Sequence, residues 1–101
     1  MPTTPIAPCP VEQAIQIIGG KWKLLLLRSL LLNGPQLYNE LLASVTGISA
    51  KELTRNLGEL AKSTLVAHGD SALYTLTPAG QALMPTFQSL LTWASTNLPV
   101  R

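Results

Sequence analysis

The stretch NELLASVTGISAKELTRNLGEL, residues 39–60, predicts two helices joined by a tight turn. Its first part has apolar residues at helical spacing, which would form the buried side of a helix over about 39–44: Leu41, Leu42 and Val45. Asn39 is the expected N-cap of that helix, because its side-chain oxygen can accept a hydrogen bond from a free backbone amide. The segment Thr46-Gly47-Ile48 then predicts a three-residue turn.

The second helix starts with a strong local signal. Ser49 and Glu52 have the S-x-x-E spacing of a capping box, in which each side chain accepts a hydrogen bond from the other residue's backbone amide. Apolar residues then recur at helical spacing, so the helix continues to about Lys62 and is expected to bury one side: Leu53, Leu57, Leu60 and Ala61. A short helix, a glycine turn and a longer capped helix follow the order of a helix-turn-helix.

The side of this helix opposite the leucines carries positive charge. In a helix-turn-helix the second helix enters the major groove with its N-terminal residues near the base edges. Lys51 and Arg55 lie four residues apart on one face, where their cationic groups can bind phosphates or the acceptor edge of guanine. Basic residues on a solvated helix face are also an ordinary surface feature, so spacing alone leaves both interpretations open. The candidate DNA-binding residues are Asn39, Ser49, Lys51, Thr54, Arg55 and Lys62.

A change to period-two patterning predicts a small β-hairpin over residues 65–76. Its strands would be 65–68 and 73–76, joined by the turn-forming loop Gly69-Asp70-Ser71-Ala72. The hairpin directly follows the second helix of the motif.

The C-terminal part predicts one long helix over residues 78–98. Thr77 is the expected N-cap, and Pro78 suits the first helical position because its missing N–H is not needed there. Pro85 lies inside the helical pattern and is expected to kink the helix near Met84.

The N-terminal third predicts an arm and two helices. Residues 1–8 hold three prolines and are expected to form an extended arm. The next helix has one apolar stripe, which needs a partner surface: Val11, Ala14, Ile15 and Ile18. Gly19-Gly20 is expected to end that helix. The helix over about 21–32 is apolar on nearly all sides, so we expect it to be central and to end at Asn33-Gly34-Pro35.

The composition indicates a single domain that associates with itself. Of its 101 residues, 12% are charged and 47% hydrophobic, whereas about 25% are charged in an average soluble domain. A monomer would therefore cover its surface poorly, which favours an oligomer, most often a two-fold dimer. The net charge of +2 permits an anionic partner without requiring one.

Several functions are excluded or disfavoured by residue counts. The start MPTTPIAPCP lacks the features of a signal peptide, and no apolar run approaches the roughly 20 residues of a membrane span, so a cytoplasmic protein is expected. One cysteine and one histidine leave no ligand set for zinc, and no metal or other cofactor is expected. A thiol enzyme is disfavoured because there is no second cysteine and His68 lies on the distant hairpin.

Three segments resemble the HxlR-type winged-helix transcriptional regulators, which are relatives of the MarR family. They are CPVEQAIQIIGGKWKLLLLRSLL at 9–31, NGPQLYNELLASVTGISAKELTRNLGEL at 33–60 and LTPAGQALMPTF at 76–87. Together these segments span nearly the whole chain, and their combination of motifs is specific.

The resemblance implies a mainly α fold with a small β-hairpin (α+β), a winged helix-turn-helix acting at the bacterial nucleoid. It also implies a homodimer held by the first and last helices, a recognition helix over 49–62, double-stranded operator DNA as partner, and no enzymatic activity. Some such proteins sense quinones, aldehydes or oxidants through a cysteine that corresponds to Cys9.

Two departures from the family pattern predict weaker DNA binding. The expected wing loop, HGDSAL, has no lysine or arginine, and Gly58 stands where the family commonly has arginine. Fewer cationic contacts release fewer counterions, so we expect weaker affinity and a shallower salt dependence than in a fully basic relative.

Cys9 has two interpretations. It precedes Pro10, which favours the extended backbone of an N-cap, and a thiolate there would face free amides and the positive end of the helix dipole. The nearby Glu12 carboxylate opposes a thiolate. A free cysteine is also often just a small hydrophobic residue. Cys9 is therefore either a redox or electrophile sensor, or a structural residue.

Two further functions compete with redox sensing. One is a regulator that responds to a small effector, for which aromatic residues expected in the core or at a dimer contact could line a pocket: Trp22, Phe87 and Trp93. The other is a winged-helix interaction module with weak DNA affinity.

Overall fold

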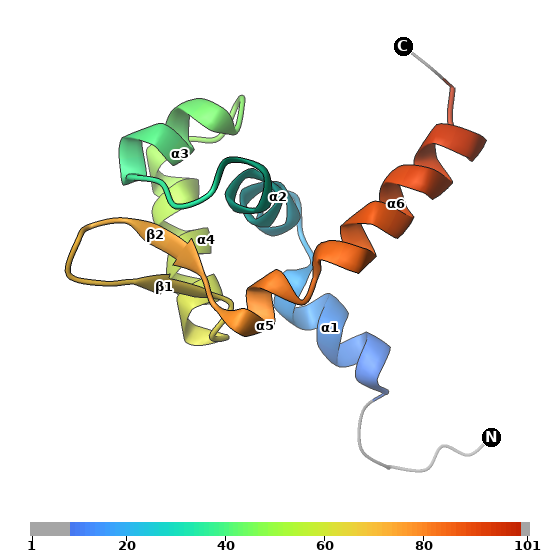
Figure 1. Cartoon of the computed structure of the whole chain (residues 1–101), viewed down its shortest axis with the longest axis horizontal. Coiled ribbons are helices and arrows are strands. Elements are labelled where there is room, and N and C mark those ends of the chain that lie inside the picture. Colours follow the sequence, from blue (N-terminus) through green and yellow to red (C-terminus); the bar gives the residue numbers. More distant parts are fainter. Residues whose placement is uncertain (1–8, 100–101) are drawn as a thin grey trace.

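The computed structural model describes residues 9–99, so the arm expected over residues 1–8 lies outside the described residues. The described chain is mainly helical with one antiparallel hairpin (Figure 1). In chain order its elements are α1 (Pro10–Ile18), α2 (Lys23–Asn33), α3 (Tyr38–Ser44), α4 (Ala50–Lys62), β1 (Val66–His68), β2 (Tyr74–Leu76), α5 (Pro78–Gln81) and α6 (Met84–Asn97).

The hydrophobic core forms around α2. This helix packs against α3, α4 and β2, and the core's largest fully buried side chains are all leucines: Leu26, Leu27, Leu41, Leu53 and Leu60. The expectation that α2 is central is confirmed only for the side that packs against α3, α4 and β2. On the other side of the helix, Leu25 and Leu32 are exposed. An apolar helix surface therefore remains open on the side that faces α6.

The hairpin pairs β1 with β2 in antiparallel register, with Val66 opposite Leu76. Gln36, in the segment between α2 and α3, adds a third short extended piece. Its backbone N–H donates to the Tyr74 carbonyl at 3.1 Å, and the Tyr74 N–H donates to the Gln36 carbonyl at 2.7 Å. These two bonds fix the loop end of β2 to the segment that precedes α3.

A buried polar network connects α2 with α3. The Gln36 amide donates to the backbone carbonyl of Ser29 at 3.1 Å and to its hydroxyl at 3.0 Å. The Ser29 hydroxyl lies 2.7 Å from the Ser44 hydroxyl. Buried polar groups are costly unless they are hydrogen-bonded, so this network fixes the loop and α3 against α2.

The prediction of Asn39 as an N-cap is wrong. The cap of α3 is Leu37, and Asn39 is an exposed residue of the first turn. The carboxylate of Glu40 accepts a hydrogen bond of 2.8 Å from the Leu37 backbone amide, so the helix start is stabilised from its third position by a side chain that needs no polar cap residue.

The single kinked helix expected over 78–98 is instead two helices, α5 and α6. The N-cap prediction is confirmed, because the Thr77 hydroxyl accepts from the Gly80 amide at 3.1 Å. Pro85 lies in the first turn of α6, where its missing N–H leaves no helical bond unmade. The proline therefore starts a new helix and does not kink a continuous one. The expected burial of Ala61 is also wrong, since that residue is exposed at the end of α4.

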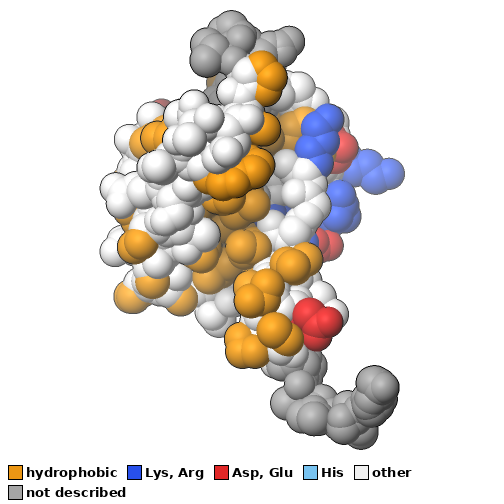
Figure 2. All heavy atoms as spheres, turned by 90° about the vertical axis from the view of Figure 1, so that its right-hand side faces the viewer, with side chains coloured by type: hydrophobic (Ala, Val, Ile, Leu, Met, Phe, Trp, Pro, Cys, Tyr) orange, Lys and Arg blue, Asp and Glu red, His pale blue; other side chains and the backbone are white. Residues whose placement is uncertain are grey.

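α1 and the far end of α6 extend away from the core (Figure 1). Cys9 is the N-cap of α1 and Pro10 its first residue, as expected, but no residue of α1 is buried. Large apolar side chains are exposed on both helices, among them Val11 (62%), Ile15 (60%), Leu91 (67%) and Trp93 (56%). Figure 2 shows this side of the molecule, with hydrophobic side chains spread across it and Lys and Arg gathered at one edge.

Within residues 9–99, none of the helices combines the length and the apolar character that crossing a membrane requires.

Candidate nucleic-acid interface

The start of α4 is fixed by the capping box that the sequence predicts. The Ser49 hydroxyl accepts a hydrogen bond from the Glu52 amide at 3.1 Å, and the Ser49 amide donates to the Glu52 carboxylate at 3.1 Å. These bonds from Ser49 hold the pKa of the Glu52 carboxyl below its usual 4.5. The carboxylate consequently stays charged at neutral pH and faces the positive end of the helix dipole.

A tyrosine connects α4 with the preceding helix. The Tyr38 hydroxyl donates to the backbone carbonyl of Ala50 at 2.9 Å and lies 2.9 Å from the Thr54 hydroxyl. In the turn between the two helices, Gly47 has a φ of +91°, and the following Ile48 is buried. The two helices of the motif are therefore held together by their own side chains, and the Thr54 hydroxyl already has a partner within the protein.

The face of α4 that points away from the core carries the predicted cations. Lys51, Arg55 and Lys62 are all exposed. The Arg55 side chain is 58% exposed, and its guanidinium lies 3.5 Å from the Glu59 carboxylate. Glu59 makes a closer ion pair of 2.6 Å with Lys23, and this bond is the main cause of its lowered pKa. Of the two cations paired with Glu59, Arg55 is therefore the more distant and the more exposed.

Two contacts that local sequence patterns did not reveal join α4 to the start of α2. The Trp22 indole N–H donates to the Glu52 carboxylate at 3.1 Å, and Lys23 pairs with Glu59. Trp22 is 8% exposed, in agreement with its expected place in the core. The paired residues are 30 or more positions apart in the chain, so helical spacing within one segment carries no signal for them.

The hairpin offers no positive side chain, as the sequence already indicates. His68 is exposed, its ring stacks on Tyr74 with centroids 3.9 Å apart, and one ring nitrogen lies 3.2 Å from the Ala72 carbonyl oxygen. Asp70 is exposed in the loop. Contacts from this wing to phosphate would have to come from polar or backbone groups.

Cys9 is exposed, and its backbone amide donates to the Glu12 carboxylate at 3.3 Å. Within residues 9–99, His, Cys, Asp and Glu side chains do not gather in any group that could hold a metal ion. Of the predicted site residues, five lie on or directly before α4, while Asn39 lies on α3 and Cys9 directly precedes α1.

Comparison with known proteins identifies the family to which this chain belongs. The family model for HxlR-like helix-turn-helix proteins matches residues 17–101. The chain belongs to the HxlR-like helix-turn-helix family.

Relatives of this HxlR-like chain are similar over most of their length. The HTH-type transcriptional regulator YodB of Bacillus subtilis (strain 168) is 32% identical over 93 residues, which cover 85% of this chain and 82% of YodB. The solved structure of quinone-bound YodB from B. subtilis has a TM-score of 0.81 and 34% identity, and the match covers 87% of this chain and 99% of that one. The redox regulator HypR in its oxidised form has a TM-score of 0.74 and 32% identity, with 91% and 100% covered.

These matches confirm the winged helix-turn-helix fold that the sequence predicts, with α3 and α4 as its two helices and the hairpin as its wing. The HxlR-like chain is a helix-turn-helix transcriptional regulator and not an enzyme.

Proposed function

We propose that this HxlR-like regulator binds operator DNA as a homodimer, with α4 in the major groove and Lys51 and Arg55 as its main contacts. The observation that carries this proposal is the exposed cationic face of α4, opposite the buried leucines of the same helix. Lys51 and Arg55 are four residues apart, a rise of about 6 Å along one face, which fits neighbouring positions in the groove.

The remaining predicted residues have supporting roles in this proposal. Ser49 fixes the start of α4, and Thr54 holds Tyr38 and through it α3. Lys62, in the last turn of α4, lies about 16 Å along the helix from Lys51 and would meet phosphates away from the base edges. Asn39 is exposed on α3, the helix that crosses the backbone in this class of motif.

The homodimer is supported by the apolar surface that α1 and α6 leave uncovered. Val11 and Ile15 lie four residues apart on α1, and Trp93 is exposed on the part of α6 that extends from the core. Exposed apolar surface of this kind marks an interaction site. A two-fold dimer would bury it and present two copies of α4 to successive half-sites of an operator.

The test is DNA binding measured by fluorescence anisotropy with a duplex from the region upstream of the protein's own gene. We expect Arg55→Gln to weaken binding by about 1–3 kcal/mol and to relax the sequence preference. Lys62→Gln should weaken binding to all duplexes alike. Arg28→Gln removes the same charge from α2 and is the matched control, expected to change little.

Two outcomes would contradict the proposal. Arg55→Gln and Arg28→Gln could have equal effects, which would remove α4 from the interface. The wild-type chain could also bind the operator no better than an unrelated duplex, which would favour an interaction module with weak DNA affinity.

We also propose that Cys9 senses electrophiles or oxidants. Support comes from its exposed position at the N-cap of α1 and from relatives solved as quinone-bound YodB and as a redox regulator, HypR. The thiolate would add to a quinone ring by forming a sulfur–carbon bond. With diamide, two thiols would give up two electrons and two protons, forming a disulfide to Cys9 of the partner subunit or to a small thiol.

A path from Cys9 to the DNA-binding helix runs through described contacts. α1 ends at Gly19-Gly20, and the next residues include Trp22 and Lys23, which bind Glu52 and Glu59 of α4. Cys9→Ser should retain DNA affinity and lose the response to quinone or diamide. An unchanged response in Cys9→Ser would leave Cys9 as a structural residue and favour a regulator with a small non-covalent effector.

A further inference from the structure

An acidic residue lies beside the cations of α4 that are proposed to bind DNA. Glu59 follows Arg55 by about one helical turn, and its side chain is 43% exposed. A carboxylate is unfavourable at this place, because it repels phosphates and can hold the Arg55 guanidinium on the protein. The proposed function gives Glu59 no role.

Glu59 is shared unequally between two cations. Its Oε1 atom lies 2.6 Å from the Lys23 Nζ atom, whereas its Oε2 atom lies 3.5 Å from a guanidinium nitrogen of Arg55. Lys23 thus occupies one of the two oxygens that a guanidinium needs for two parallel hydrogen bonds. Arg55 also precedes Glu59, which is the less favourable order for opposite charges four residues apart on a helix. The contact with Arg55 is therefore the weaker of the two.

Lys23 has an unusual position for a lysine. It is the first residue of α2, where the positive end of the helix dipole disfavours a cation. Its side chain is also only 14% exposed, and burial of a charge is costly without a partner. The first turn of α2 holds no acidic residue of its own. Both costs are therefore offset by Glu59, which comes from α4.

We propose that Lys23 is a positioning residue for DNA binding, which holds the Glu59 carboxylate and thereby leaves Arg55 available to the operator. The inference rests on the proposed role of Arg55 at DNA. Without Lys23, both oxygens of Glu59 can pair with the Arg55 guanidinium, and an unneutralised carboxylate lies beside the phosphates. Because Lys23 is largely buried, it acts through Glu59 and not by touching DNA.

The test is a double-mutant cycle on operator binding by the full chain, measured by fluorescence anisotropy. Lys23→Gln should weaken binding about threefold per subunit and so about tenfold for the dimer, the effect of one exposed charge on another in water. Glu59→Gln should bind the operator at least as tightly as wild type. The double variant Lys23→Gln/Glu59→Gln should bind like Glu59→Gln, because Lys23 has nothing left to hold.

The two single variants separate positioning from a purely structural role. Both break the same ion pair between α2 and α4, so a structural role predicts equal losses of DNA affinity. Positioning predicts a loss for Lys23→Gln alone, and Lys23→Arg should retain wild-type affinity because it keeps the charge.

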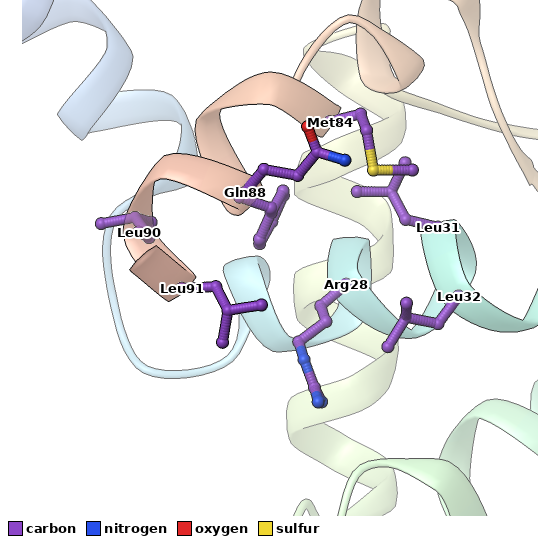
Figure 3. A pocket seen from close by; sticks show the side chains of 8 residues that line it. Arg28, Leu31, Leu32, Met84, Gln88, Leu90 and Leu91 are labelled. Carbon is purple, nitrogen blue, oxygen red and sulfur yellow. The ribbon is translucent and has the colours of Figure 1, made fainter. Parts of the chain in front are cut away.

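Arg28→Gln is the matched control, since it removes a charge from the same helix. Arg28 is exposed and makes no ion pair within residues 9–99. In Figure 3 its side chain lies between Leu32 and Leu91, on the side of α2 that faces α6. We expect Arg28→Gln to change operator affinity little.

Three results would overturn the proposal. Lys23→Gln could bind the operator as tightly as wild type. Lys23→Gln and Glu59→Gln could weaken binding equally, which would make the ion pair a structural link only. Lys23→Gln could also weaken binding in the Glu59→Gln background, which would make Lys23 itself a phosphate contact. Failure of the proposed function is a separate result, because Arg55→Gln would then bind the operator as tightly as wild type.

Discussion

Replacing Gly80 by alanine should strongly destabilise the fold, because this glycine is buried where the hairpin meets α5. A Cβ at Gly80 would collide with the Leu65 carbonyl oxygen and come within 3.0 Å of the Leu76 Cδ2 atom. The Leu65 backbone cannot easily move, since its N–H donates to Leu60 at 3.0 Å and its carbonyl accepts from Thr77 at 3.1 Å.

The expected cost follows from these contacts. Overpacking costs about 1–3 kcal/mol, and displacement of Leu65 would weaken a hydrogen bond of about 1 kcal/mol. The better helix propensity of alanine returns up to about 1 kcal/mol. We therefore expect Gly80→Ala to lower the free energy of unfolding by about 2 kcal/mol, and Tm by roughly 8–16 °C.

Gly58→Ala provides the matched comparison. Gly58 lies inside α4 with no neighbouring atom within 4 Å of the added Cβ, so alanine should stabilise the fold by about 0.5–1 kcal/mol. Thermal unfolding followed by circular dichroism, at one fixed protein concentration, measures both variants. If Gly80→Ala unfolds at or above the wild-type temperature, the packing argument at the base of the wing is wrong.

Three further predictions concern acid stability, capping and salt. Hydrogen bonds from Ser49 and Lys23 lower the pKa values of Glu52 and Glu59 below 4.5, so the stability that these two carboxylates contribute is present above pH 4.5 and is lost as the pH falls through the lowered values. The urea midpoint of unfolding should fall over that pH range. It should fall less in the double variant Glu52→Gln/Glu59→Gln. Ser49→Ala should cost about 1 kcal/mol in urea unfolding, whereas Ser71→Ala on the exposed hairpin loop should cost almost nothing. Three cations on α4 in each subunit give a slope of log affinity against log salt of about −5.4 for the dimer, and a slope clearly steeper than about −6 would show that other phosphate contacts exist.

Elements with a local signal were predictable from the sequence. The capping box at Ser49, the Thr77 cap and the stop at Gly19-Gly20 all depend on residues within a few positions of each other. The start of α3 has no polar cap residue to mark it, because Glu40 stabilises it from the third helical position. A proline such as Pro85 can either kink a continuous helix or lie in the first turn of a new one. The local sequence fits both, and the packing of the folded chain decides between them.

The cationic face of α4 was also predictable, because burial of the leucines leaves Lys51 and Arg55 on the opposite side. The contacts of Trp22 and Lys23 with α4 were not, since they join residues far apart in the chain. The open side of α2 was hidden for a related reason. The sequence presents α2 as apolar on nearly all sides, and the structure covers only one of those sides.

The two tryptophans lie in contrasting surroundings, which gives the chain two built-in fluorescent reporters. Trp22 is buried, with its indole bound to Glu52 in the first turn of α4, while Trp93 is largely exposed on α6. Iodide in the solvent should quench Trp93 and spare Trp22, and association through α6 should protect Trp93. Fluorescence spectra recorded with and without iodide can therefore follow two places separately, with no added label. The unquenched signal of Trp22 reports on the start of α4, and the quenched signal of Trp93 reports on the surface of α6.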